Sequence, residues 1–61
     1  MKVRNVLERL KADGWVLVSQ RGSHRQFKHP SRPGKVTVAG GRNVDLAMDT
    51  LTNIRKQAGW K

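Results

Sequence analysis

The first residues of the chain carry apolar side chains at helical spacing. The positions i, i+3, i+4 and i+7 are occupied by Val3, Val6, Leu7 and Leu10. Together they form one stripe along a helix, and the charged residues between them fall on the solvent side. Gly14 follows the stripe and suits the left-handed conformation that ends many helices. The pattern predicts an amphipathic helix over residues 2–12.

Three short segments after this helix are typical of β-strands. They span residues 15–19, 24–29 and 35–39. The first is rich in aromatic and β-branched residues, and the third alternates apolar and polar positions. A polar segment with Gly22 separates the first two and predicts a hairpin turn. Pro30 and the residues up to Gly34 predict a loop before the third.

The last segment, residues 44–61, returns to approximately helical spacing. Asp45 or Asp49 is suited to cap the start of this helix, and Gly59 resembles a C-terminal cap. Trp60, just beyond the cap, is expected to fold back onto the last turn. The order of elements is then helix, three-stranded meander, helix.

This order predicts an α+β fold with two layers, α-β-β-β-α. The antiparallel three-stranded sheet carries both helices on one face and leaves its other face open. A chain of 61 residues has room for a single domain, so residues 1–61 are expected to form one unit.

The alternation along the strands assigns side chains to the two faces of the sheet. Phe27, Val36 and Val38 are expected in the core. The open face then collects His24, Gln26, Lys28, Lys35 and Thr37, flanked by Arg21 and Ser23 of the turn. The first strand stays ambiguous, because its residues of both parities are apolar.

Charge narrows the class of partner. Thirteen Lys and Arg residues oppose four acidic ones, which gives a net charge of +9 and a pI near 11.6. A field of this sign on so small a body favours nucleic acid as the partner. A membrane surface comes second, because the apolar stretches are too short for an interfacial anchor or a transmembrane span. The absence of cysteine and of a signal peptide predicts a soluble, cytoplasmic protein.

Few kinds of catalysis fit these residues. The acidic residues are scattered and no metal-binding spacing is present, so no metal or cofactor is expected. The chain lacks a third member for a Ser/His/Asp triad and has no dinucleotide fingerprint. RNA cleavage by the ribose 2′-hydroxyl needs only a proton acceptor and cations around the phosphate. His24 with Arg21, Lys28 and Lys35 meets that need.

Other interpretations remain open. A histidine on a basic strand is often only a phosphate contact, in which case the protein is a non-catalytic RNA-binding module. A DNA-binding regulator ranks last, because three strands separate the two helices and leave no helix-turn-helix. Trp15 and Trp60 could stack on bases, but core packing is favoured in so small a domain. His29, beside Pro30, is given no role.

The segment Gly22-Ser23-His24, with Phe27, His29 and Pro30 behind it, resembles the HicA family of mRNA interferase toxins. The likeness continues in Asp13-Gly14-Trp15 and in the final helix, and it covers nearly the whole chain. It implies a fold like that of double-stranded-RNA-binding domains, an endoribonuclease that cuts mRNA, and a HicB-type antitoxin as partner. His24 stands at the catalytic position of the motif, and Gly22 would give the turn its permissive backbone. The RNA contacts are expected from Arg21, Ser23, Gln26, Lys28 and Lys35.

Overall fold

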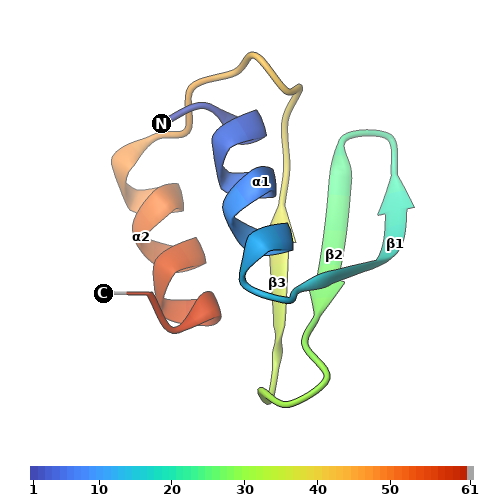
Figure 1. Ribbon diagram of the computed structural model, residues 1–61. Coiled ribbons are helices and arrows are strands. Elements are labelled where there is room, and N and C mark those ends of the chain that lie inside the picture. The colour runs from blue at the N-terminus through green and yellow to red at the C-terminus, as the bar shows by residue number, and fades with distance from the viewer. Residues whose placement is uncertain (61) are drawn as a thin grey trace.

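A computed structural model describes residues 1–60 of the chain, so Lys61 of the expected final helix lies outside the described residues. The elements are α1 (Val3–Ala12), β1 (Val16–Arg21), β2 (His24–Lys28), β3 (Lys35–Val38) and α2 (Met48–Ala58). Figure 1 shows them in this order along the chain. The expected α-β-β-β-α order is confirmed. None of the described helices is long and apolar enough to cross a membrane.

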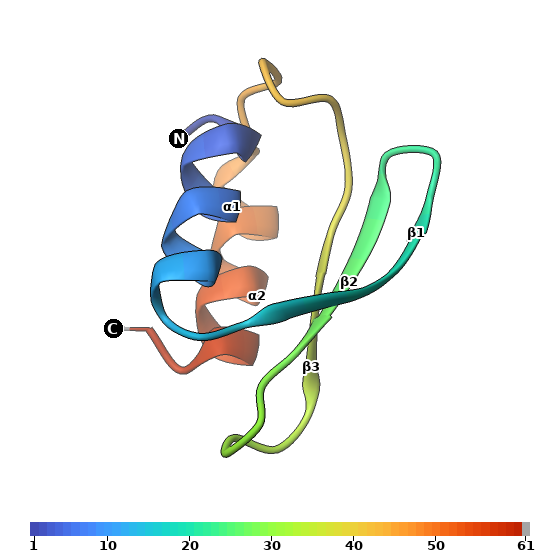
Figure 2. The same cartoon turned by 45° about the vertical axis from the view of Figure 1, so that its right-hand side comes forward.

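The three strands form one antiparallel sheet in the order β1-β2-β3. Both helices lie on the same side of this sheet, as Figure 2 shows. The core between the two layers consists of Val3, Val6, Leu10, Trp15, Phe27, Val36, Val38, Ile54 and Ala58. The protein therefore has the two-layer α+β architecture of double-stranded-RNA-binding domains.

The face assignment for β2 and β3 is confirmed. Phe27 pairs with Val36, and both side chains are buried under the helices. Gln26 pairs with Thr37 and Lys28 with Lys35, and these side chains face away from the helices. A single large apolar residue in β2 is therefore enough to fix which side of the sheet meets solvent.

The first strand behaves differently from the other two. All six residues of β1 are exposed, including Val16 (56%), Leu17 (45%) and Val18 (53%). In Figure 2 the β1–β2 hairpin bends away from the helices toward its turn. The buried residue of the expected first strand is Trp15, which lies just before β1 and packs in the core.

The expected start of the final helix was wrong. Residues 44–47 are not helical; instead, the amide of Val3 donates to the carbonyl of Val44 (2.9 Å) and that of Leu46 to the carbonyl of Met1 (3.0 Å). These bonds to the N-terminal segment satisfy backbone groups that a helix would otherwise use. The helix begins at Met48 with Ala47 as its N-cap and no side-chain cap bond.

Neither aspartate proposed as the cap fills that position. Asp49 lies inside the first turn of α2, where its carboxylate accepts a hydrogen bond from the amide of Thr50 (2.9 Å) and suits the positive end of the helix dipole. Asp45 forms a β-bridge with Lys2 and a 3.9 Å ion pair with the same residue. The C-terminal cap was predicted correctly: Gly59 has φ 75° and ends the helix.

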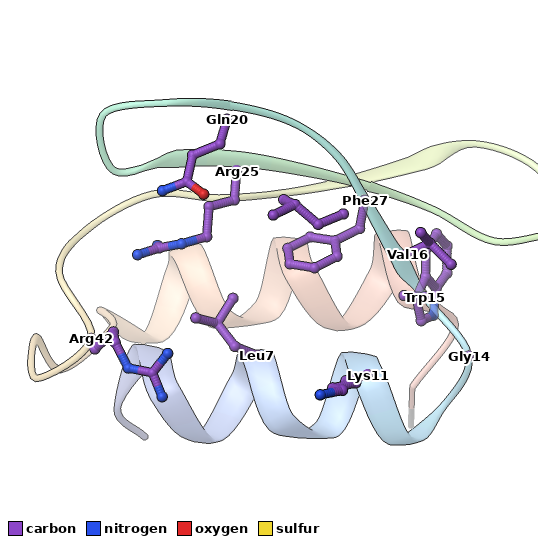
Figure 3. A pocket seen from close by; sticks show the side chains of 10 residues that line it. Leu7, Lys11, Gly14, Trp15, Val16, Gln20, Arg25, Phe27 and Arg42 are labelled. Atoms are coloured by element: carbon purple, nitrogen blue, oxygen red, sulfur yellow. The ribbon is translucent and has the colours of Figure 1, made fainter.

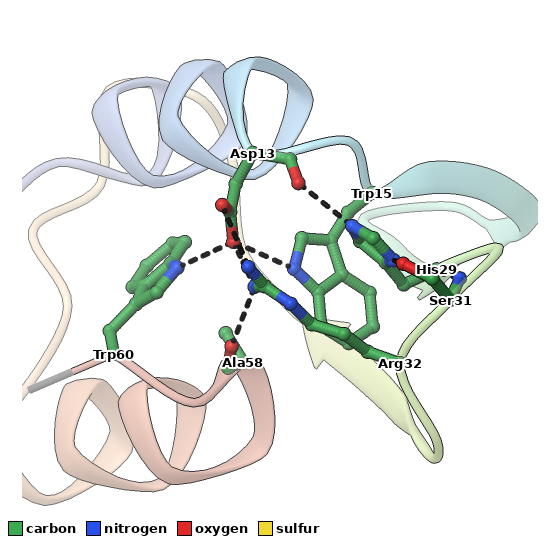
Figure 4. Close-up of polar contacts among 7 residues, drawn as sticks. All are labelled: Asp13, Trp15, His29, Ser31, Arg32, Ala58 and Trp60. Carbon is green, nitrogen blue, oxygen red and sulfur yellow. Dashed lines mark hydrogen bonds and ion pairs between the residues drawn. The ribbon is translucent and has the colours of Figure 1, made fainter.

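The carboxylate of Asp13 links the C-terminal ends of the two helices. Asp13, just after α1, accepts hydrogen bonds from the indoles of Trp15 (3.3 Å) and Trp60 (3.2 Å) and forms an ion pair with Arg32 (Figure 4). The hydrogen bond from Arg32 is the main reason that the pKa of Asp13 is lowered from its ordinary value. Trp60 also stacks against the guanidinium of Arg9, 4.3 Å from the ring centre, so its ring packs on the end of α1 and not only on the last turn of α2 where it was expected.

His29 belongs to this structural cluster. Its Nδ1 accepts a hydrogen bond from the amide of Ser31 (3.1 Å), and its Nε2 lies 2.9 Å from the carbonyl of Asp13 (Figure 4). Because Nδ1 is the acceptor, Nε2 carries the proton and donates to that carbonyl. The ring also lies edge-on to Trp15. His29 therefore anchors the loop after β2 to the end of α1.

Candidate functional site

A β-bulge decides which side chains of β1 accompany His24. Leu17 pairs with Phe27 and Ser19 with Gln26, so β1 contains one extra residue, Val18, at this point. In a regular strand Leu17 and Ser19 would share the helix side of the sheet. The extra residue turns Ser19 to the outer face instead, and Arg21, two residues on, follows it there.

His24 lies at the turn end of β2, directly across from Arg21. Side chains of directly opposite residues in antiparallel strands start about 5 Å apart, which puts the imidazole and the guanidinium within reach of one phosphate. The two residues line a shallow hollow of about 460 Å³ together with Ser19 and Gln26. His24 is exposed, and within the described residues no hydrogen bond holds its side chain.

The turn next to this hollow is the two-residue connection Gly22-Ser23. Gly22 has φ 57°, in the left-handed region that the first position of such hairpin turns requires. The carbonyl of Gly22 accepts a hydrogen bond from the Gln20 side chain (2.9 Å), and that of Ser23 accepts one from Arg25 (3.2 Å). These bonds hold the turn, and the Ser23 hydroxyl remains at the surface beside His24.

Two further predicted site residues form a separate cationic pair. Lys28 and Lys35 are cross-strand partners at the other end of β2, four residues from His24, or about 13 Å along the strand. Like charges directly opposite each other are unfavourable in a sheet. A phosphate group bound between the two ammonium groups would remove that repulsion.

The sheet carries no negative charge of its own. All four acidic residues of the chain lie outside the three strands, in α1, in α2 or in loops. The outer face therefore presents Arg21, Lys28 and Lys35 without a competing carboxylate. A polyanion that follows β2 meets a cation at each end of the strand.

The residues predicted from the sequence thus separate into two groups. Arg21, Gln26 and His24 line one hollow and Ser23 lies in the adjacent turn, whereas Lys28 and Lys35 lie beyond the reach of a single phosphate there. Ser19 is a lining residue that sequence reasoning missed, because nothing in the sequence marks Val18 as a bulge. Within residues 1–60 no three histidine or carboxylate side chains gather closely enough to hold a metal ion.

The arrangement supplies the groups needed to move a proton and stabilise a phosphate. An imidazole can accept and return a proton near neutral pH, and a guanidinium opposite it can bind a phosphoryl oxygen. Ser19 and Gln26 add hydrogen-bond donors and acceptors for a ribose or a base edge.

Comparison with known proteins gives one clear result. The family model described as "HicA toxin of bacterial toxin-antitoxin" matches residues 3–60, which is nearly the whole chain. No curated protein matches the sequence at a significant level.

Proposed function

Because the chain belongs to the HicA toxin family of bacterial toxin–antitoxin systems, we propose that it is an mRNA-cleaving endoribonuclease with His24 as its general acid–base. The reaction would need no metal ion or other cofactor. The observation that carries the proposal is the pairing of His24 with Arg21 in one hollow on a sheet face that is free of acidic residues.

The proposed reaction is an internal transesterification. His24 accepts the proton of a ribose 2′-hydroxyl, the 2′-oxygen forms a bond to the adjacent phosphorus, and the bond from phosphorus to the 5′-oxygen breaks. The leaving oxygen takes a proton from water or from the protonated His24. The products are a 2′,3′-cyclic phosphate and a 5′-hydroxyl end. Arg21 stabilises the charge that builds up on the phosphoryl oxygens.

The other polar residues of the face would position the strand. Ser19, Ser23 and Gln26 offer hydrogen bonds next to the scissile phosphate, and Lys28 with Lys35 holds a phosphate further along. The spacing of about 13 Å between His24 and Lys28 spans more than one nucleotide, so the substrate is expected to be an extended single strand.

The test is cleavage of a long RNA by the purified protein and its His24→Ala variant in the presence of EDTA. Fragments from the wild type alone, ending in 2′,3′-cyclic phosphate, would support the proposal. General acid–base catalysis typically contributes about 10²–10⁴-fold, so the variant should be slower by at least about 100-fold. RNA with 2′-deoxyribose at the cut site should resist both proteins.

The same experiment distinguishes the ribonuclease from the alternative, a non-catalytic RNA-binding module. In that case both proteins would shift the RNA in a gel and leave it intact. Because His24 is exposed, the alanine variant should keep the wild-type thermal stability. An unfolded variant would instead assign His24 a structural role.

Membership in a toxin family implies an antitoxin partner. We propose a HicB-type antitoxin that acts in the bacterial cytoplasm and blocks access of mRNA to the His24 face. Growth arrest on expression of the wild type, relieved by co-expressed antitoxin and absent for His24→Ala, would support this pairing.

A further inference from the structure

A second surface lies on the opposite side of the sheet from His24. It is a groove of about 580 Å³ between α1 and the inner face of the β1–β2 hairpin. Figure 3 shows Leu7 of α1 and Phe27 of β2 facing each other across it. Trp15 and Leu17 also line it, together with the cations Lys11, Arg25 and Arg42.

The groove exists because the helical layer does not cover the whole sheet. The helices bury Phe27 of β2 and Val36 and Val38 of β3, but no residue of β1. Leu17, which pairs with Phe27 and shares its face, stays 45% exposed. Exposed apolar surface of this kind on a small domain marks an interaction site. An additional helix beside α1 would cover it in the same way that α1 and α2 cover the other strands.

The charged residues around the groove have one sign. Lys11, Arg25 and Arg42 line it, and none of its lining residues is acidic. The guanidinium of Arg25 donates to the carbonyls of Gly40 (2.9 Å) and Ser23 (3.2 Å), which fix its position without neutralising its charge. The groove therefore fits an occupant that is apolar on one side and acidic at its borders.

RNA fits these features poorly. The aromatic residues of the groove, Trp15 and Phe27, are 3% and 6% exposed, so neither offers a ring face on which a base could stack. A second copy of this chain fits poorly as well, because each copy carries a net charge of +9. A polypeptide with acidic residues flanking an apolar stripe matches both the aliphatic floor and the cationic border.

We propose that this groove binds an acidic amphipathic helix of the antitoxin. The helix would lie beside α1, with its apolar stripe on Leu7 and Leu17 and its carboxylates near Lys11 and Arg42. Identifying the source as the antitoxin rests on the proposed toxin–antitoxin pairing. This helix would fix the antitoxin to the helix side of the sheet, while another part of the antitoxin covers the His24 face.

The test compares two charge reversals of equal size. Lys11→Glu changes the border of the groove, whereas Lys56→Glu changes an exposed residue of α2 that does not line it. Affinity for the purified antitoxin is measured by titration calorimetry at one salt concentration. Lys11→Glu should raise Kd at least about tenfold over Lys56→Glu, because only the former puts like charges in contact. Leu17→Asp, at a position outside the core, should weaken binding by a similar factor.

Measuring RNA binding by the same variants distinguishes an antitoxin helix from the other possible occupants of the groove, RNA and a second copy of this chain. The two charge reversals should weaken RNA binding equally, and Leu17→Asp should leave RNA cleavage unchanged. Equal antitoxin affinity for Lys11→Glu and Lys56→Glu, with Leu17→Asp binding like wild type, would overturn the proposal. A loss of RNA binding that is specific to the groove variants would also overturn the proposal. A toxin dimer that Leu17→Asp dissociates would overturn it as well. Because the titration requires no cleavage, failure of the ribonuclease proposal would not alter its result.

Discussion

The orientation of β2 can be tested with three consecutive residues. Phe27 is buried between the sheet and the helices, while its neighbours Gln26 and Lys28 point to the opposite face. Phe27→Leu removes three buried carbons, whereas Gln26→Ala and Lys28→Ala remove atoms from the open face, where Gln26 is partly buried and Lys28 is exposed. The free energy of unfolding should therefore respond strongly at the middle position and weakly at the two flanking ones.

The expected magnitudes follow from burial. At about 0.8 kcal/mol for each buried carbon, Phe27→Leu should destabilise the fold by about 2 kcal/mol. A domain of this size has a total stability of about 3–9 kcal/mol, so the variant should still fold. In a domain of this size, about 2 kcal/mol corresponds to a fall in Tm of roughly 8–16 °C. Each flanking variant should stay within about 0.5 kcal/mol of the wild type.

Urea denaturation followed by circular dichroism measures all three values. The slope of the transition should be the same for each variant, because the surface exposed on unfolding hardly changes. A Gln26→Ala variant as unstable as Phe27→Leu would show that the two residues share a face. Since His24 has the same parity as Gln26, that result would also remove His24 from the open face and with it the proposed site.

Three further predictions concern single residues. Gly59→Ala should destabilise the protein by about 1–2 kcal/mol in thermal denaturation, because φ is 75°; no atom within 4 Å would clash with the new Cβ, so a larger loss would contradict a purely conformational cost. The pKa of Asp13 is lowered chiefly by the hydrogen bond from Arg32, and this shift stabilises the fold fully above the ordinary pKa of 3.8. The stabilisation is lost as the pH falls through the folded-state pKa, so the urea midpoint should fall less steeply with decreasing pH for Asp13→Asn than for the wild type. Equal slopes of urea midpoint against pH would refute the linkage. Arg21→Gln should reduce the salt dependence of single-stranded RNA binding by about 0.7 in logarithmic slope, measured by fluorescence anisotropy, and an unchanged slope would exclude a phosphate contact at Arg21.

The sequence predicts the parts of the fold in which local pattern and tertiary packing agree. One large apolar residue, Phe27, orients β2, and the alternation of Val36 and Val38 orients β3. For β1 the pattern carries no such information, since consecutive apolar residues fit either face. The bulge at Val18 depends on how two strands pair, which a single strand does not encode. The place of Ser19 in the site could not be predicted for that reason.

Long-range contacts explain the other differences. Val44 and Leu46 fit a helical spacing, yet hydrogen bonds from and to the N-terminal residues keep this segment extended. The local propensity for a longer helix is overridden by partners more than 40 positions away in the sequence. The sequence likewise does not predict that Asp13 links the two helices, because its partners Arg32 and Trp60 lie 19 and 47 positions further along.

The contact between Trp60 and Asp13 bears on when a toxin becomes dangerous to the cell that makes it. The core closes only when α2 adds Ile54 and Ala58 to it, and Trp60 then locks the end of α2 to the end of α1. During synthesis these residues leave the ribosome after α1 and the three strands. A nascent chain therefore cannot complete its fold, and so cannot present a fully folded toxin, until its message has been translated through α2 and Trp60.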